Sequence, residues 1–297
     1  MTLEPAPIPP DRTSPRLPAP LEQYEVVHPD VPPAWEGATI LHLTDLHVRR
    51  ARPRTPVIRD LLRILPTIEV DLVVLTGDYP DKPRDESAAL EVLKALAAAW
   101  RTRRGAFAIW GNHDSAGIMG AGHQVPGVTW LDADARDLGG SFAVAGMSFP
   151  EDPLALAARL DLARITPRSH FILTLAHYPT EAYSAAALGL QLVLAGHTHG
   201  GQIRFSSRSA PHTSGDMPSD LPSGLFMLDN AASAAGGVGA LGGVGGTLVA
   251  VSRGLGEAVL PWRVNCPAQV PVYVLRRGEI QPGPSGGSRT LRALRRW

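Results

Sequence analysis

A chain of 297 residues, 44% of them hydrophobic, can bury a substantial core, which permits a globular enzyme of one large or two small domains. Its 28 basic and 28 acidic side chains cancel, so composition gives no sign of a general nucleic-acid binder. Because Cys266 is the single cysteine, the chain can form neither an intrachain disulfide nor a four-thiolate zinc site. No stretch of the sequence approaches the ~20 consecutive apolar residues that a membrane-spanning helix needs.

The first 36 residues contain ten prolines and form an expected Pro-rich N-terminal arm. Up to about Pro20 we expect a flexible or polyproline-like leader, with recruitment of a proline-binding domain as the less favoured alternative. Gln23–His28 has a short apolar pattern typical of an edge strand.

The central domain, residues 37–278, alternates strand-like and helix-like segments, which predicts an α/β fold of βαβ units. The expected strands are Ala38–Thr44, Leu72–Thr76, Ala106–Trp110, Phe171–Ala176 and Leu192–Ala195. The expected helices are Thr55–Leu65, Asp85–Trp100, Pro153–Arg164 and Thr180–Leu188. Three later apolar runs are expected to complete a second sheet: Gly224–Leu228, Thr247–Val251 and Val270–Leu275.

Two biased segments interrupt or follow this pattern. Residues 231–246 contain seven glycines and five alanines, and we expect a mobile loop because ordering so many glycines is entropically costly. A phosphate-binding glycine loop is disfavoured, since no Lys-Ser/Thr follows. Residues 279–297 form a basic C-terminal tail; a solvated tail is the favoured reading, and peripheral contact with an anionic membrane is the alternative.

Five polar clusters each follow an expected strand: Asp45-x-His47, Gly77-Asp78, Gly111-Asn112-His113-Asp114, His177 and Gly196-His197-Thr198-His199. Carboxyl ends of strands in α/β folds converge on one crevice, so the clusters are expected to meet. A lone Asp is usually a helix cap and a lone His a core residue, but together they supply enough ligands for two metal ions. A single carboxylate such as Asp78 can bridge two cations at the ~3.5–4 Å separation of two-metal sites.

In this order the clusters resemble the signature of the calcineurin-like metallophosphoesterases, over roughly Thr39 to Arg276. Three further segments resemble a bacterial branch of YkuE-like phosphodiesterases: Gly196–Arg204, Ser252–Gly256 and Arg263–Pro267. The resemblance implies a four-layer α/β/β/α sandwich of two mixed sheets flanked by helices, with a dinuclear metal site at the carboxyl ends of the strands. It makes residues 37–278 the catalytic domain.

The resemblance also implies the role of each site residue. The first ion would be held by Asp45, His47, Asp78 and His199, and the second by Asp78, Asn112, His177 and His197. A metal-bridging hydroxide would be the nucleophile. His113 would stabilise the transition state and donate a proton to the leaving group, oriented by Asp114.

The resemblance further implies a hydrolase that cuts phosphodiesters, with lipid-linked or nucleotide diesters as candidate substrates. A phosphomonoesterase or phosphoprotein phosphatase on the same site and a catalytically silent metal-binding scaffold are the alternatives. Manganese is the expected metal, with Fe, Zn or Co also suited to these ligands.

Arg204 and Arg253 are candidate phosphate contacts, although arginine more often forms an ion pair at the surface. His28, His42, His123, His170 and His212 lie outside the clusters and are expected to be surface or core residues. A cytoplasmic location, with peripheral membrane contact as an alternative, is expected.

Overall fold

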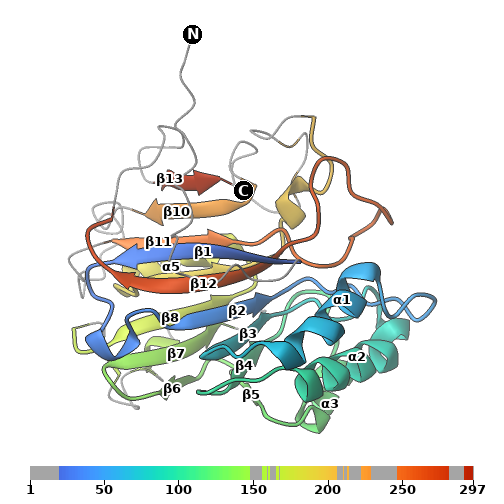
Figure 1. Cartoon of the computed structure of the whole chain (residues 1–297), viewed down its shortest axis with the longest axis horizontal. Coiled ribbons are helices and arrows are strands. Elements are labelled where there is room, and N and C mark those ends of the chain that lie inside the picture. Colours follow the sequence, from blue (N-terminus) through green and yellow to red (C-terminus); the bar gives the residue numbers. More distant parts are fainter. Residues whose placement is uncertain are drawn as a thin grey trace.

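The computed structural model consists of two mixed β-sheets packed face to face, with helices on both outer faces (Figure 1). It describes residues 20–147, 156–158, 160, 165–166, 168–205, 210, 213, 222–228 and 246–280, together with the backbone of 291–296. The two sheets with helices on their outer faces confirm the expected four-layer α/β/β/α fold class. Within these residues, no helix combines the length and apolar character needed to cross a bilayer.

The first sheet has six strands in the order β1-β12-β2-β3-β4-β5. Their bounds are β1 Leu21–His28, β2 Thr39–Leu43, β3 Leu72–Thr76, β4 Ala106–Ile109, β5 Val128–Trp130 and β12 Val270–Arg277. The run β2 to β5 is parallel, and β12 is antiparallel to β2. The carboxyl ends of β2, β3 and β4 thus lie together at one end of the sheet.

The second sheet has seven strands in the order β13-β10-β11-β9-β8-β7-β6. Their bounds are β6 Ala135–Asp137, β7 Phe142–Met147, β8 Phe171–Ala176, β9 Leu192–Ala195, β10 Gly224–Leu228, β11 Thr247–Val251 and β13 Leu291–Arg296. β7, β8, β9 and β11 are parallel, so this sheet also gathers strand ends at one edge.

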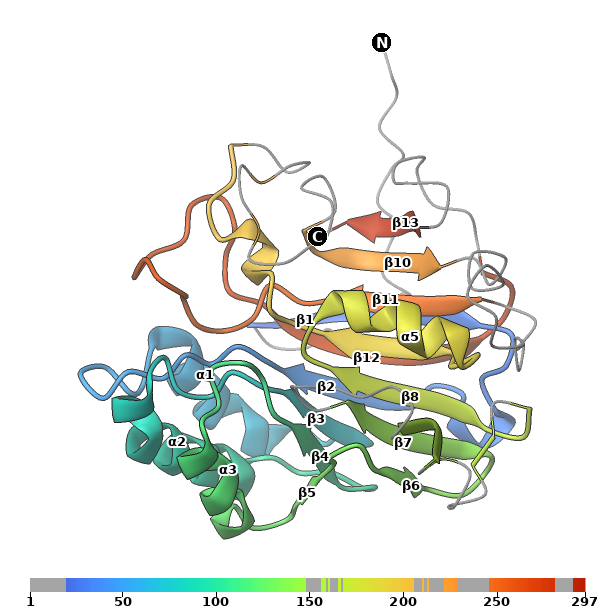
Figure 2. The ribbon, with the colours of Figure 1, turned by 180° about the vertical axis from the view of Figure 1, so that it is seen from behind.

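Alternating side chains of the strands build three apolar layers. In β3, Leu72 and Val74 pack into the core between the sheets, whereas Val73 and Leu75 face the helices of the first sheet. The outer layer there is formed by α1 Pro56–Ile64, α2 Glu86–Ala99 and α3 Ala116–Ala121. The second sheet is covered by α5 Ala182–Ala187, seen in front in Figure 2, and by Leu156 and Leu160.

Helix boundaries follow local chemistry. α1 begins at Pro56, whose fixed backbone suits the first helical position, and the Thr55 side chain accepts a hydrogen bond from the Ile58 amide. Short 3₁₀ turns precede α2 and α5, namely η3 Pro83–Asp85 and η5 Pro179–Glu181, and the others are η1 Pro33–Trp35, η2 Leu65–Thr67, η4 Gly122–Gln124 and η6 His199–Gly201. Of the expected helix at 153–164, only residues 156–158 and 160 are described, and these are helical.

Two strands lie in stretches expected to flank the central domain. β1 falls within the expected N-terminal arm and pairs along its whole length with β12, placing Tyr24 and Val26 in the core between the sheets. β13 falls within the expected basic tail and pairs with β10. The structured part of the chain thus extends beyond residues 37–278 at both ends. Each pairing covers a strand edge that would otherwise present free N–H and C=O groups.

The expected placement of Val270–Leu275 in the second sheet is wrong. This segment forms β12, which lies between β1 and β2 in the first sheet. After β11 the chain crosses from one sheet to the other through residues 252–269, and Tyr273 and Leu275 then enter the core between the sheets. The Ala/Gly-rich segment 231–246 falls, except for Gly246, outside the described residues.

His42 gives this fold an acid-sensitive contribution to stability. The side chain is fully buried on β2, with Nε2 2.8 Å from the Thr76 hydroxyl, and burial lowers its pKa from 6.5 to about 3. Below pH 6.5 the unfolded chain gains a proton at this position that the folded chain does not, so stability is lost as pH falls towards 3.

We therefore expect His42 to account for about 2 kcal/mol of the stability lost between pH 7 and pH 5. Urea unfolding of the wild type and of His42→Phe at both pH values measures this, because the variant has no titrating group here. An equal pH-dependent loss in both proteins would contradict it.

Candidate metal centre

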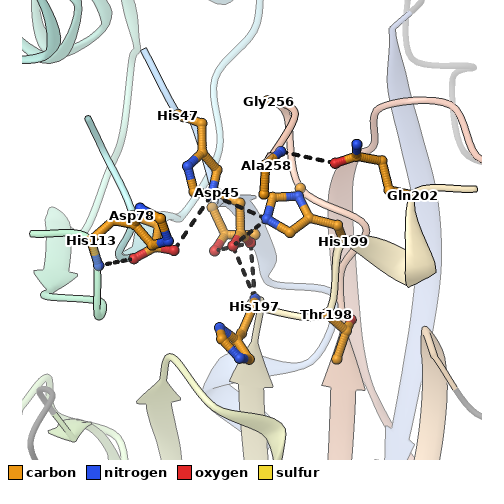
Figure 3. Close-up of polar contacts among 12 residues, drawn as sticks. Asp45, His47, Asp78, His113, His197, Thr198, His199, Gln202, Gly256 and Ala258 are labelled. Atoms are coloured by element: carbon orange, nitrogen blue, oxygen red, sulfur yellow. Dashed lines mark hydrogen bonds and ion pairs between the residues drawn. The ribbon is translucent and has the colours of Figure 1, made fainter. Parts of the chain in front are cut away.

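The five polar clusters converge at the carboxyl ends of five strands drawn from both sheets. Asp45 and His47 follow β2, Asp78 follows β3, and Asn112 and His113 follow β4. From the second sheet, His177 follows β8 and His197 and His199 follow β9. Figure 3 shows Asp45, Asp78, His47 and His199 pointing toward one another, with the backbone N–H of His197 donating to the Asp45 carboxylate at 3.0 Å. The convergence expected from the alternating pattern is thus present.

The clustered side chains form groups suited to holding cations. One ligand atom from each of Asp45, His47 and His199 lies within 4.8 Å of the others, and the same holds for Asp78, His177 and His197. The Nε2 atoms of His47 and His199 are 3.1 Å apart, a separation at which two neutral imidazoles can share one proton or one cation.

Asp78 lies between the two groups. Its Oδ2 atom is 3.4 Å from Nε2 of His47, in the first group, and 3.3 Å from Nε2 of His177, in the second. The amide oxygen of Asn112 is 2.9 Å from the same His177 nitrogen, which places it beside the second group. One carboxylate oxygen of Asp78 therefore faces an imidazole of each group.

The backbone at these residues is unusual. Ten described non-glycine residues have positive φ, and half of them are candidate ligands: Asp45, His47, Asp78, His197 and His199. This left-handed conformation costs each residue about 1 kcal/mol or more and persists only where surrounding structure enforces it. The strand-end turns thus hold their side chains inward at an energetic cost that bound cations would offset.

Electrostatics at the centre favour positive charge. Burial raises the pKa of Asp45 to about 6, and the nearby Asp78 carboxylate adds to this effect. Burial alone would lower the pKa of His177, but Asp78 and Asp45 outweigh it and raise that pKa to about 10. Burial would raise the pKa of Asp78, yet His177 and His47 hold it well below its usual range. Two buried carboxylates thus create a field that stabilises a cation here.

The buried carboxylate of Asp114 positions Asp78 rather than His113. Its oxygens accept hydrogen bonds from the backbone N–H groups of Gly111, Asp78 and Tyr79 at 2.7, 2.9 and 2.9 Å. These bonds fix the turn after β3 against the turn after β4. The expected contact between Asp114 and the His113 ring is replaced by this role.

The His113 ring is oriented by Asp81. The His113 Nδ1–H donates to the backbone carbonyl of Asp81 at 3.0 Å, which leaves Nε2 to exchange a proton. One ring nitrogen of His113 also lies within 4.8 Å of a ring nitrogen of His47 and of a carboxylate oxygen of Asp78. His113 is more exposed than the buried candidate ligands.

Asp81 has a further contact that the sequence did not indicate. Its carboxylate lies 3.7 Å from Nδ1 of His47 and 3.1 Å from Nε of Arg49. At 3.7 Å the carboxylate makes no hydrogen bond to Nδ1, so its negative charge acts on the His47 ring through space and favours a positive charge there. The only feature of the sequence that could have indicated Asp81 as a site residue is its place a few residues after the end of β3.

Arg204 and Arg253, the candidate phosphate contacts, are both turned into the protein. Arg204 donates to the Gly200 carbonyl and the Ser223 hydroxyl, each at 2.6 Å. Arg253 forms an ion pair with Glu22 of β1 at 2.9 Å and donates to the Pro267 carbonyl. The guanidinium groups stabilise loop and strand positions and are not among the clustered ligands.

Close packing of glycines against Asp45 explains part of the ligand geometry. A Cβ atom at Gly254 would lie 2.6 Å from Cβ of Asp45, and one at Gly196 would lie 2.2 Å from its Oδ2. No other residue type fits at either place without moving the carboxylate.

Gly254→Ala is therefore expected to weaken metal binding by at least about tenfold, because it displaces Asp45. Gly127→Ala is the matched control: Gly127 has φ +72 against +70 for Gly254, but no atom lies within 4 Å of its added Cβ. Both variants carry the same backbone strain, so a calorimetric titration with Mn²⁺ isolates the clash. Equal affinities of the two variants would contradict this reading.

The non-cluster histidines are placed as expected where they are described. His28 and His42 are fully buried, whereas His123 and His170 lie outside the centre. His212 lies outside the described residues.

The donor set fits borderline divalent cations. Imidazole nitrogens combined with carboxylate and amide oxygens suit Mn, Fe, Zn or Co, and sulfur is absent from the clustered ligands. The close approach of the His47 and His199 nitrogens and the buried carboxylates both agree with cations held here.

Comparison with known proteins gives a consistent result. Residues 38–201, more than half of the chain, match the family model described as calcineurin-like phosphoesterase. The chain is 25% identical over 269 residues to the uncharacterized metallophosphoesterase YkuE of Bacillus subtilis (strain 168), covering 83% of this chain and 82% of that protein. It is 33% identical over 183 residues to phosphodiesterase YaeI of Escherichia coli (strain K12), covering 56% of this chain and 62% of that protein. The solved structure of phosphopantetheinyl hydrolase PptH from Mycobacterium tuberculosis covers 55% of this chain and 83% of its own at 11% identity, and its TM-score of 0.35 supports no conclusion.

Proposed function

This chain belongs to the calcineurin-like phosphoesterase family and is a hydrolase of phosphoester bonds, and on that premise we propose that it is a phosphodiesterase that uses two metal ions. The observation that carries the proposal is the position of Asp78. One carboxylate oxygen lies within 3.4 Å of an imidazole from each ligand group, the arrangement that a bridging ligand requires.

The ligand sets follow from the two groups. We assign Asp45, His47, Asp78 and His199 to one ion, and Asp78, Asn112, His177 and His197 to the other. Two divalent ions supply a hydroxide nucleophile at neutral pH and polarise phosphoryl oxygens. We propose manganese for both, with Fe, Zn or Co as alternatives.

The remaining chemistry is assigned to His113. The leaving alkoxide needs a proton, and a protonated imidazole can deliver it from Nε2. The Asp81 carbonyl accepts from Nδ1–H at 3.0 Å and stabilises the doubly protonated ring before that transfer. Asp114 holds the turns that carry Asp78 and His113 and is a positioning residue.

The preference for diesters rests on two supports. The relative YaeI bears the name phosphodiesterase, and the glycine-rich segment after His199 resembles the corresponding bacterial branch. Lipid-linked and nucleotide diesters are the substrate classes we propose. A phosphomonoesterase or phosphoprotein phosphatase would use the same ligands.

The test compares two chromogenic substrates after the protein is loaded with Mn²⁺. We expect hydrolysis of a bis-aryl phosphodiester to exceed that of the matching aryl phosphomonoester. A ratio well below one would replace the diesterase with a monoesterase. No turnover of either substrate by protein that binds two ions would favour a metal-binding scaffold instead.

A further inference from the structure

Exposed apolar side chains gather on two loops beside the metal centre. Among the described residues, six large apolar side chains are exposed, and five of them belong to segments 202–205 and 257–265. We call these five the apolar rim: Phe205, Val259, Leu260, Trp262 and Val264, with exposed fractions of 83, 93, 38, 49 and 37%. Apolar side chains concentrated in this way mark an interaction surface.

The apolar rim is held in place rather than loosely exposed. The Gln202 side chain accepts from the Ala258 N–H at 2.9 Å, as Figure 3 shows, and donates to the carbonyls of Leu260 and Trp262. Backbone bonds between Arg204 and Val264 and between Val264 and Gln202 join the two segments. The buried amide of Gln202 thus fixes the loop whose apolar side chains point outward.

The backbone of Val259 is strained, so exposing this apolar side chain has an energetic cost. It is 93% exposed and has φ +58, a left-handed conformation that is unfavourable for a β-branched residue. Such strain persists only where neighbouring contacts enforce it, and it is typical of functional loops. The exposed position of the Val259 side chain is therefore explained neither by burial in the core nor by the backbone preference of valine.

A cluster of cations adjoins the apolar rim. Five basic side chains are exposed on segments 50–54 and 82–84: Arg50, Arg52, Arg54, Lys82 and Arg84. The acidic residues within residues 49–85 that neighbour them, Asp81 and Asp85, are buried and accept bonds from Arg49 and from the Arg50 amide. In a chain of zero net charge, this local excess of positive charge is distinctive.

The basic and apolar segments form one surface. Arg49 Nη2 donates to the Glu257 carbonyl at 2.9 Å and so joins the basic segment to the loop that carries the apolar rim. The Leu255 and Gly256 amides donate to the carbonyls of Thr44 and Asp45, which places the loop directly beside the metal centre. In both ribbon views, the loop after β2 and the loop before β12 project from the same end of the molecule (Figures 1 and 2).

We propose that this end of the protein docks on an anionic phospholipid surface. The apolar rim would enter the boundary between headgroups and acyl chains, where Trp is favoured, and the basic side chains would contact the headgroups. The mouth of the metal centre would then face the bilayer. A nucleic acid would account for the cations but not for exposed Val259 and Leu260, whereas an anionic bilayer accounts for both. The proposal goes beyond the proposed phosphodiesterase and holds whether or not the substrate is a lipid.

Sedimentation with phosphatidylcholine vesicles, with and without phosphatidylglycerol, tests the proposal. We expect the Mn²⁺-loaded protein to bind only the anionic vesicles. Val259→Ser/Leu260→Ser/Trp262→Ser and, separately, Arg50→Gln/Arg52→Gln/Arg54→Gln should each lower the partition coefficient by at least ~10-fold. Arg101→Gln/Arg103→Gln/Arg104→Gln is the charge-matched control, since it also removes three exposed arginines and these precede β4 at the opposite end of the sheet; it should bind vesicles like the wild type.

Two further measurements keep the outcome decisive. Turnover of a soluble bis-aryl diester should be unchanged in the serine variant, which separates docking from the proposed hydrolysis. Brominated phosphatidylglycerol should quench wild-type tryptophan fluorescence more than that of Trp262→Phe, a readout that does not depend on the triple variant. Absence of binding, binding unaffected by the serine changes, or equal binding displaced by a single-stranded polyribonucleotide would each overturn the proposal; the last would identify a general polyanion site.

Discussion

Asp78→Asn is expected to remove both metal ions rather than one. The Asp78 Oδ2 atom lies 3.4 Å from His47 and 3.3 Å from His177, so it faces both ligand groups. The amide keeps the shape of the side chain but loses the negative charge and places an N–H donor or a neutral oxygen between two imidazoles. Loss of an outer partner alone costs 10–100-fold in metal affinity, so we expect more than ~100-fold here. Metal content after desalting and calorimetric titration with Mn²⁺ measure the effect.

Matched variants separate bridging from ordinary ligation. His199→Asn changes only the first group and His197→Asn only the second, so each should retain about one ion per chain where the wild type retains two. Asp78→Asn should retain neither. One tightly held ion in Asp78→Asn would contradict the bridging position and restrict Asp78 to a single ion.

The location of the centre could be predicted because its ligands follow buried strands. Apolar runs such as Leu72–Thr76 are recognisable locally, and parallel strands necessarily end at a common edge. Asp78 and His177 could thus be grouped although they are 99 positions apart in the sequence numbering. The strand pattern does not predict the distances between the ligand side chains, because these depend on the left-handed backbone conformation at the ligands.

Sheet membership was harder to predict than strand position. Val270–Leu275 is recognisable as a strand, but its pairing with β2 depends on which strand edge is open after the 252–269 crossing. β7 was missed because Phe142–Met147 contains small residues whose burial gives a weak apolar signal. β5 and β6 have three residues each, too short for a period to be visible.

Residues that act on the site through backbone groups were also beyond sequence reasoning. Asp81 orients His113 through its carbonyl oxygen, a group that every residue type carries. Gln202 supports the apolar rim through backbone atoms of three residues more than fifty positions away. Such contacts depend on chain path rather than on residue type, so no local pattern indicates them.

His113→Ala is expected to keep both ions and lose most turnover. The His113 side chain belongs to neither of the two assigned ligand sets, and its backbone N–H, which donates to Asp78 at 2.8 Å, remains in the variant. Removal of a general acid should lower kcat for an aryl phosphodiester by about 10²–10⁴-fold. Metal content and steady-state kinetics measure the two quantities, and His170→Ala is the control for loss of a histidine away from the centre.

Substrates with leaving groups of different pKa distinguish proton donation by His113 from charge stabilisation by His113. A strongly acidic phenol departs without a proton, so the loss caused by His113→Ala should shrink as the pKa of the leaving group falls. If the loss were the same for good and poor leaving groups, His113 would stabilise charge on the phosphoryl group without donating a proton. Since Nδ1–H is committed to the Asp81 carbonyl, only Nε2 can deliver the proton, and imidazole added to the variant should restore part of the rate with poor leaving groups.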